Sequence, residues 1–229
     1  CINFFFRRQR RMFIRDRNVV IADVAPTIDT FTVPPTTSEG TAISVIGAAT
    51  DPGADTLTLT WSWGDGTAST TGTTASHTFT DEGVFAVTLT VSDQAGVTVS
   101  QTTNVTVSNV IPVISGYRIP SGPDASVLTL AATIVDPGND TINAVWTLGD
   151  GTTLTGATVT HAYVDEGTFA VSLAVDDGDG GTASISGTAA AFNVAPTIDA
   201  LTGNSTGPEG VALSWTATIT DPGTSDVIS

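Results

Sequence analysis

The chain of 229 residues lacks most of the chemistry that cross-links or anchors a protein. Its single cysteine, Cys1, permits neither an internal disulfide bond nor a zinc site built from cysteines. It contains no lysine, which excludes the Lys-Asn isopeptide bonds found in some surface proteins. No run of about eighteen apolar residues is present, so the sequence predicts no transmembrane helix. Stability must therefore come from packing, with metal ions as a second source.

Positive charge is also scarce and unevenly placed. All seven cations are arginines, and six lie in the first seventeen residues: Arg7, Arg8, Arg10, Arg11, Arg15 and Arg17. Beyond them only Arg118 remains against a formal net charge of −16, which excludes the chain as a whole from the nucleic-acid binders. A mean hydropathy of +0.21 with 40% apolar residues is too hydrophobic for a disordered acidic chain. The acidic part should therefore fold, as two or more small domains.

Residues 1–17 differ in composition from everything that follows. Their arginines are flanked by phenylalanines, which could bind an anionic membrane surface or nucleic acid. The same break in composition fits a truncated or frame-shifted translation of the gene, in which Met12 is a possible internal start. We favour this interpretation. The segment has neither the continuous apolar region nor the cleavage site of a signal peptide, so an export signal is not visible in it.

Internal repeats organise the rest of the chain. Proline-containing segments recur at residues 25–28, 111–114 and 195–198, about 85 residues apart. Asp-Pro-Gly begins at residues 51, 136 and 221, Gly-Asp-Gly at 64 and 149, and Asp-Glu-Gly at 81 and 165. This spacing predicts a basic segment over 1–17, complete domains over 18–109 and 110–194, and the truncated start of a third over 195–229. The third cannot close a sandwich alone, so we expect it to be mobile or to dock on the second.

Within a repeat the apolar residues alternate with a period of two, as in half-buried strands. Residues 85–91 place Phe85, Val87, Leu89 and Val91 on one face and Ala86, Thr88 and Thr90 on the other. In the first repeat the pattern predicts strands near residues 27–33, 42–50, 56–63, 73–79, 84–92 and 96–107. Short strands separated by Gly, Pro and Asp clusters, without a helical stretch, predict an all-β sandwich.

The ordered motifs resemble the polycystic kidney disease (PKD) domain family. They are Asp-Pro-Gly, then Thr-Leu-Thr-Leu-Thr-Trp-Ser-Trp-Gly-Asp-Gly-Thr from residue 56, then His-Thr-Phe-Thr-Asp-Glu-Gly from residue 77. The second repeat departs modestly, with Leu148 in place of Trp63 and Asp124-Ala125 in place of Glu39-Gly40. The resemblance implies tandem immunoglobulin-like, seven-stranded sandwiches in a large exported or cell-surface protein. Such domains act as spacers and binding units and are not catalytic.

Aspartate and histidine recur in a pattern that superficially suggests catalysis. Asp65 and Asp150 lie between glycines at the end of a strand, where a structural turn is the favoured interpretation. His77 and His161 precede an aromatic residue by two positions and have no Ser or Cys nucleophile motif beside them. We therefore expect a structural role for these residues and no enzymatic activity.

The acidic residues after the second and sixth strands form the candidate metal sites. In an immunoglobulin-like topology these two loops lie at the pole where the chain enters from the preceding domain. The candidate calcium ligands are Asp51, Asp55 and Asp93 in the first repeat, and Asp136, Asp140 and Asp177 beside Asn109 in the second. Several hard oxygen ligands without nearby cations suit Ca²⁺. The alternative is that these are solvated turn residues.

These observations predict a non-catalytic spacer or adhesion module of an extracellular or cell-surface protein. The short linkers around Asn109 and Asn193 lead directly into X-Pro pairs, which favours a monomeric rod with limited bending. Expected partners are proteins or polysaccharides, with no nucleic acid. The alternative is an accessory binding module of a secreted protease or glycosidase, and a third idea is adaptation to high salt.

Overall fold

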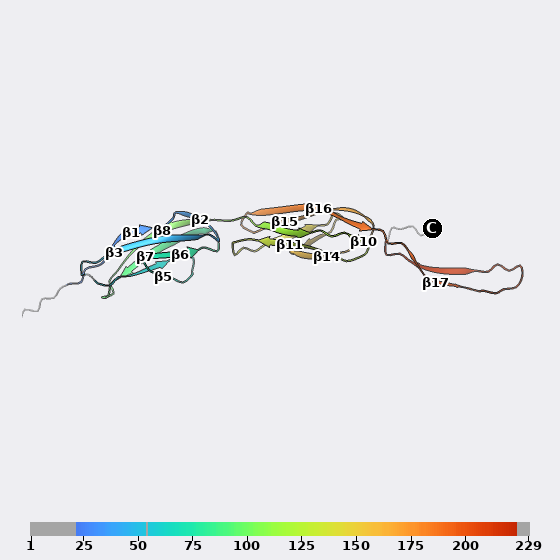
Figure 1. The fold of residues 1–229 in the computed structure, drawn as a ribbon, viewed down its shortest axis with the longest axis horizontal. Helices are drawn as coiled ribbons and strands as arrows, with labels where there is room; N and C mark the ends of the chain where they lie inside the picture. Colours follow the sequence, from blue (N-terminus) through green and yellow to red (C-terminus); the bar gives the residue numbers. More distant parts are fainter. Residues whose placement is uncertain (1–21, 54, 224–229) are drawn as a thin grey trace, which may run out of the picture.

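A computed structural model describes residues 22–53 and 55–223 of the chain (Figure 1). Every regular element in this part is a β-strand, and the strands form two sandwiches and a hairpin, one after another along the long axis. The all-β, immunoglobulin-like tandem fold predicted from the sequence is confirmed. No helix long and apolar enough to cross a membrane occurs within the described ranges. The predicted basic segment, residues 1–17, lies outside the described residues.

The first sandwich consists of a three-stranded and a five-stranded sheet. Its strands are β1 (Thr27–Thr32), β2 (Thr36–Ser38), β3 (Ala42–Thr50), β4 (Thr58–Ser62), β5 (Thr70–Thr71), β6 (Thr74–Thr78), β7 (Gly83–Ser92) and β8 (Thr98–Ser108). The sheets have the orders β1-β3-β6 and β2-β8-β7-β4-β5. Eight strands form where the resemblance implied seven, because Pro34 and Pro35 divide the first one. Its two parts join different sheets, β1 antiparallel to β3 and β2 parallel to β8.

The second sandwich repeats this topology strand for strand. Its strands are β9 (Val113–Arg118), β10 (Gly122–Pro123), β11 (Leu128–Val135), β12 (Asn143–Thr147), β13 (Thr153–Thr155), β14 (Thr158–His161), β15 (Gly167–Asp176) and β16 (Thr182–Phe192). The sheets have the orders β14-β11-β9 and β10-β16-β15-β12-β13. Equivalent loops therefore lie at equivalent poles in both sandwiches.

Each core is built around a tryptophan. Trp61 and Trp146 are fully buried, and their indole Nε1 atoms donate to the carbonyls of Gly72 at 3.0 Å and Gly156 at 3.1 Å. The predicted alternation of buried and exposed side chains is confirmed in β7. All six predicted strand segments of the first repeat form. The missed elements, β2 and β5, are three and two residues long, too short to show a periodicity.

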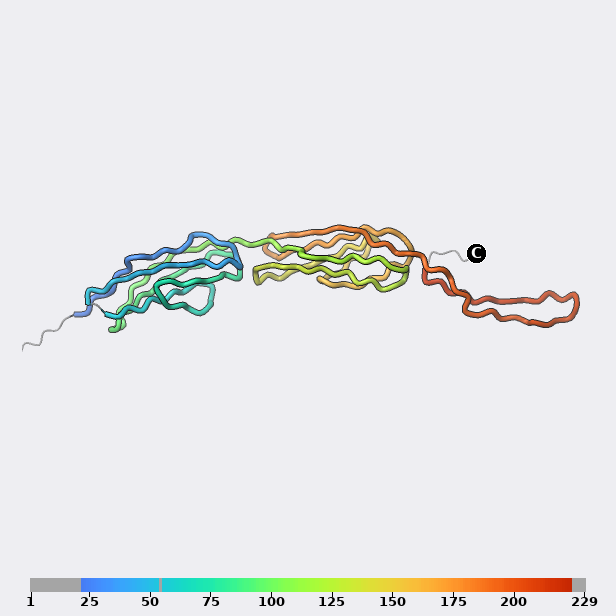
Figure 2. Tube along the Cα trace, in the orientation of Figure 1, coloured from blue at the N-terminus to red at the C-terminus, as the bar shows by residue number. Residues whose placement is uncertain are grey.

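A hairpin of β17 (Thr197–Gly203) and β18 (Trp215–Thr220) follows the second sandwich (Figure 2). It pairs Thr197 with Thr220 and skips Asp199, as β1 and β3 pair Thr27 with Thr50 and skip Asp29. Every residue of the two strands is exposed, so they do not dock on the second sandwich. The same register supports the predicted third copy, and its mobility stays a prediction.

Candidate metal centre between the two sandwiches

The predicted ligands of the second repeat meet at the pole of the second sandwich that faces the first. Asp136 and Asp140 lie in the loop after β11, and Asp177 begins the loop between β15 and β16. One carboxylate oxygen from each lies within 4.8 Å of the others. The linker residue Asn109 donates from Nδ2 to Asp177 Oδ2 at 2.9 Å. The spatial convergence that the loop topology predicts is therefore present in this repeat.

Local turns orient these carboxylates. Asp136 Oδ1 accepts the amide of Gly138 at 3.0 Å, and Asp177 Oδ1 accepts the amides of Asp179 and Gly181 at 2.9 and 2.8 Å. Asp and Gly readily form such turns, in which the side chain bonds the backbone two residues on. Each turn uses Oδ1 and leaves Oδ2 for other partners, which in Asp177 is the Asn109 side chain.

Three acidic residues of the first sandwich face this site, and the sequence reasoning missed them. Glu39 lies between β2 and β3, while Asp81 and Glu82 precede β7. These three and Asp140 form a second group of oxygens within 4.8 Å of one another. We call the set Glu39, Asp81, Glu82, Asp136, Asp140 and Asp177 the junction cluster. Its first-repeat members belong to motifs that recur in the sequence. Their position opposite the next repeat, however, depends on how the short linker brings the poles of successive domains together.

Direct contacts between the sandwiches hold the two halves of the junction cluster together. The amide of Asn139 donates to the carbonyl of Thr80 at 2.7 Å, from the second sandwich to the first. Glu39 Oε1 accepts the linker amide of Val110 at 2.5 Å. A β-carbon added at Gly40 would lie 2.5 Å from the β-carbon of Pro137, so a glycine is required for this close approach. Gly40 also has a φ of +68°, which favours glycine independently.

Negative charge is poorly compensated at the junction. Burial, and then the charges of Glu39 and Asp136, raise the pKa of Asp140 to about 6. Burial raises the pKa of Glu39 as well, against the lowering effect of the Val110 amide. Asp177 differs, because the hydrogen bond from Asn109 lowers its pKa. Arg118 is the only Arg or Lys in the described ranges, and it lies at the end of β9. No Lys or Arg of the described residues therefore belongs to the junction cluster.

Several buried oxygens of the site accept no hydrogen bond. They are Glu39 Oε2, Glu82 Oε2, Asn109 Oδ1, Asp136 Oδ2 and Asp140 Oδ2. Buried polar atoms are normally paired, because an unpaired one costs free energy on transfer from water. An all-oxygen set of carboxylates and one amide suits a hard divalent cation such as Ca²⁺. The residues therefore fit the ion that the sequence suggested.

The corresponding pole of the first sandwich has the same turns but no such close group. Asp51 Oδ1 accepts the amide of Gly53 at 2.6 Å, and Asp93 Oδ1 accepts that of Val97 at 2.8 Å. Burial and the charges of Asp93, Asp55 and Asp51 raise the pKa of Asp23. Within the described ranges, however, only the junction brings three or more carboxylates within 4.8 Å.

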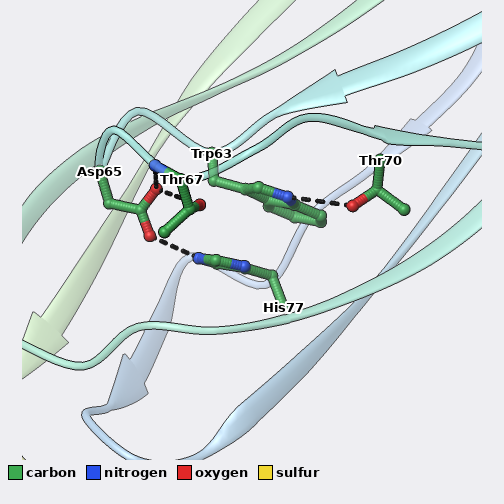
Figure 3. A network of polar contacts seen from close by, with 5 residues as sticks. All are labelled: Trp63, Asp65, Thr67, Thr70 and His77. Atoms are coloured by element: carbon green, nitrogen blue, oxygen red, sulfur yellow. Dashed lines mark hydrogen bonds and ion pairs between the residues drawn. The ribbon is translucent and has the colours of Figure 1, made fainter.

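Each Asp-His pair joins a turn to a neighbouring strand. In the first sandwich His77 Nε2 lies 2.5 Å from Asp65 Oδ2, and its ring stacks on Trp63 with centroids 4.5 Å apart (Figure 3). Thr67 donates its amide and its hydroxyl to Asp65 Oδ1, and Trp63 Nε1 donates to Thr70 Oγ1 (Figure 3). The hydroxyl of Thr67 thus stabilises the turn as a donor.

The second repeat keeps this pair in simpler surroundings. His161 Nε2 lies 2.6 Å from Asp150 Oδ2, and Asp150 Oδ1 accepts the amide of Thr152. Tyr163 donates its hydroxyl to the carbonyl of Leu148, which occupies the position of Trp63. In both repeats the pair closes a turn against a buried aromatic residue. The structural role expected for Asp65, Asp150 and the two histidines stays a prediction, which these contacts favour.

The fold defines a protein of tandem immunoglobulin-like domains, and comparison with known proteins gives the family. A sequence model described as "PKD domain" matches residues 23–107 and 109–191. Because these ranges make up most of the chain, the chain belongs to the PKD domain family. PKD domains are non-catalytic accessory modules.

Individual relatives match parts of the chain. A microbial collagenase of Vibrio alginolyticus is 38% identical over 78 residues, which are 34% of this chain and 9% of that protein. Among solved structures, the PKD1 domain of Vibrio anguillarum Epp is 25% identical with a TM-score of 0.32, covering 38% of this chain and 98% of its own. The PKD1 domain of the Vibrio cholerae metalloprotease PrtV is 23% identical with a TM-score of 0.31, covering 37% and 99%.

Proposed function

We propose that this chain is a non-catalytic spacer and adhesion segment of a larger extracellular or cell-surface protein. The observation that carries the proposal is the direct contact between the sandwiches, where Asn139 bonds Thr80 and Gly40 packs on Pro137. Together with the short linker at Asn109, this contact limits bending. A rod of this kind holds other parts of a protein away from a surface and exposes long sheet faces to protein or polysaccharide ligands.

Small-angle scattering of the full chain tests the spacer proposal. The expected pair-distance distribution is that of two sandwiches end to end, as in Figure 1. A variant in which Gly40 is replaced by Val should widen the distribution, because its side chain would collide with Pro137. A compact globule for the unaltered chain, or no change in the variant, would contradict a stiff junction.

We infer a second candidate function from the match to the microbial collagenase, namely an accessory module of a secreted hydrolase. In that case the chain would help to engage a fibrous protein substrate while catalysis lies elsewhere. Co-sedimentation with insoluble collagen fibrils tests this, with cellulose as the control for polysaccharide binding. Retention on collagen alone supports the accessory function, whereas no retention on either matrix leaves only the spacer proposal.

We also propose that Ca²⁺ binds the second sandwich through Asp136, Asp140 and Asp177. The supporting observations are the convergence of these carboxylates and the unpaired buried oxygens of Asp136 and Asp140, with Asn109 Oδ1 as a further ligand atom. Asp51, Asp55 and Asp93 would form a weaker site at the first pole. Calorimetric titration of the full chain with Ca²⁺ tests both, and the absence of heat and of any rise in melting temperature would exclude them.

A further inference from the structure

We propose a second cation site that bridges the two sandwiches, formed by Glu39, Asp81 and Glu82 of the first and Asp140 of the second. This site goes beyond a calcium site within one domain, because three of its four ligands belong to the preceding repeat. One oxygen from each residue lies within 4.8 Å of the others. The ligand is a hard divalent cation, since all the donors are carboxylates and neither His nor Cys takes part.

Glu39 provides the observation that separates this group from an ordinary acidic surface. Its side chain is 1% exposed, and Oε1 is held by the amide of Val110. The other oxygen, Oε2, is buried and accepts no hydrogen bond, and it approaches the same point beside Gly138 as Asp140 Oδ2. A carboxylate buried in this way needs a positive partner, and the described part of the chain supplies no Lys or Arg there.

The backbone around the group is shaped for close approach of these oxygens. A β-carbon added at Gly138 would lie 2.5 Å from Asp140 Oδ2 and 2.9 Å from Glu39 Oε2. Only a residue without a side chain therefore leaves room for oxygens from both repeats at this point. Glu82 Oε2 is also buried without a hydrogen-bond partner, so three of the four ligands present unpaired oxygens to one space.

A bridging ion would restrict changes in the angle between the two sandwiches. Its ligands come from both sandwiches, so binding would add cross-domain bonds beside the hydrogen bonds from Asn139 to Thr80 and from Val110 to Glu39. Asp140 belongs to both this group and the group with Asp136 and Asp177. Binding at the two sites is therefore coupled through one side chain, and a loaded junction would be stiffer than one stripped of cations.

The test uses the full chain stripped with EGTA and titrated with Ca²⁺ to about 1 mM, the affinity range of extracellular modules. Glu82→Gln keeps shape and removes one charge, and Glu39→Gln keeps the oxygen that accepts the Val110 amide. Glu166→Gln, at the equivalent position of the second repeat, is the matched control. Calorimetry gives stoichiometry and affinity, and scattering with and without Ca²⁺ gives the spread of interdomain distances.

We expect Glu82→Gln to bind one Ca²⁺ ion fewer per chain, or to bind Ca²⁺ at least about tenfold more weakly. We also expect that adding Ca²⁺ no longer narrows the distribution of interdomain distances in this variant. Glu166→Gln should behave as the unaltered chain. Identical binding and narrowing in Glu82→Gln and the unaltered chain would overturn the bridging site, as would no binding at all. If the bridging site is overturned but scattering still shows an elongated chain, the spacer proposal is unaffected. If Glu39→Gln does not fold, Glu82→Gln alone decides the result.

Discussion

The N-terminal poles of the two sandwiches carry the same motif in different surroundings. Each has an Asp-Pro-Gly turn whose carboxylate accepts the glycine amide, through Asp51 in one and Asp136 in the other. Each also has an aspartate directly after a long strand, Asp93 after β7 and Asp177 after β15, that accepts a backbone amide four residues on. Yet only the second pole brings three carboxylates within 4.8 Å, among the residues described.

The difference between the poles shows what a neighbouring domain adds. Asp140 meets Glu39 from the preceding repeat, and burial beside this charge raises the pKa of Asp140 to about 6. The Asp-Pro-Gly turn thus follows from the local sequence, whereas the close group of acidic side chains forms only where the two domains meet. The following experiments compare matched substitutions at equivalent positions, beginning with the largest expected effect.

Replacing Asp136 with Asn should remove most of the stabilisation by Ca²⁺, and replacing Asp51 with Asn should remove less. A cation at a hundred times its dissociation constant stabilises a folded protein by about 2.7 kcal/mol. Asp136 belongs to a close carboxylate group and Asp51 does not. Melting temperatures with Ca²⁺ and with EGTA measure the effect, and Asn preserves the turn in both variants. Equal losses would show that the junction contributes nothing to affinity.

Replacing Gly138 with Ala should weaken Ca²⁺ binding by about tenfold, or about 1.4 kcal/mol. The added β-carbon would lie 2.5 Å from Asp140 Oδ2 and would displace that carboxylate. At the equivalent Gly53 the nearest atoms are Asp51 Oδ1 at 3.0 Å and Asp55 Oδ2 at 3.1 Å, so Ala is accommodated more easily. Calorimetric titration of both variants measures the difference. A weaker effect at residue 138 than at residue 53 would contradict the packing described for the junction.

The sequence predicted what local chemistry determines. Alternation in residues 85–91 predicts β7, and the repeated turns place Asp136, Asp140 and Asp177 on loops that meet at one pole. Glu39 could not be predicted as a candidate ligand, because its environment depends on the orientation of a different domain. Likewise β5 has only two residues, and its pairing with Thr60 and Trp61 is imposed by the sheet beside it.

The smallest expected effect compares the Asp-His pairs of the two repeats. Asp65 and Asp150 each bond a histidine, but their side chains are 11% and 24% exposed, and only His77 stacks on a tryptophan. Screening by water weakens the more exposed interaction. Replacing Asp65 with Asn should therefore destabilise its sandwich by about 1 kcal/mol, and the same change at Asp150 should cost less. Differential scanning calorimetry of the full chain measures both.

The pH dependence of the stability of these variants shows whether the ionised carboxylate of Asp65 carries the stabilisation. Burial raises the pKa of Asp65, but hydrogen bonds from Thr67 and His77 outweigh it and the pKa is lowered. A carboxyl group with a lowered pKa contributes stability above its unfolded pKa of about 3.9, and this is lost as the pH falls through the folded value. The cost of Asp65→Asn should therefore be present at neutral pH and shrink below about pH 4. A cost that is independent of pH, or larger at Asp150, would show that the turn and not the charged pair carries the stability.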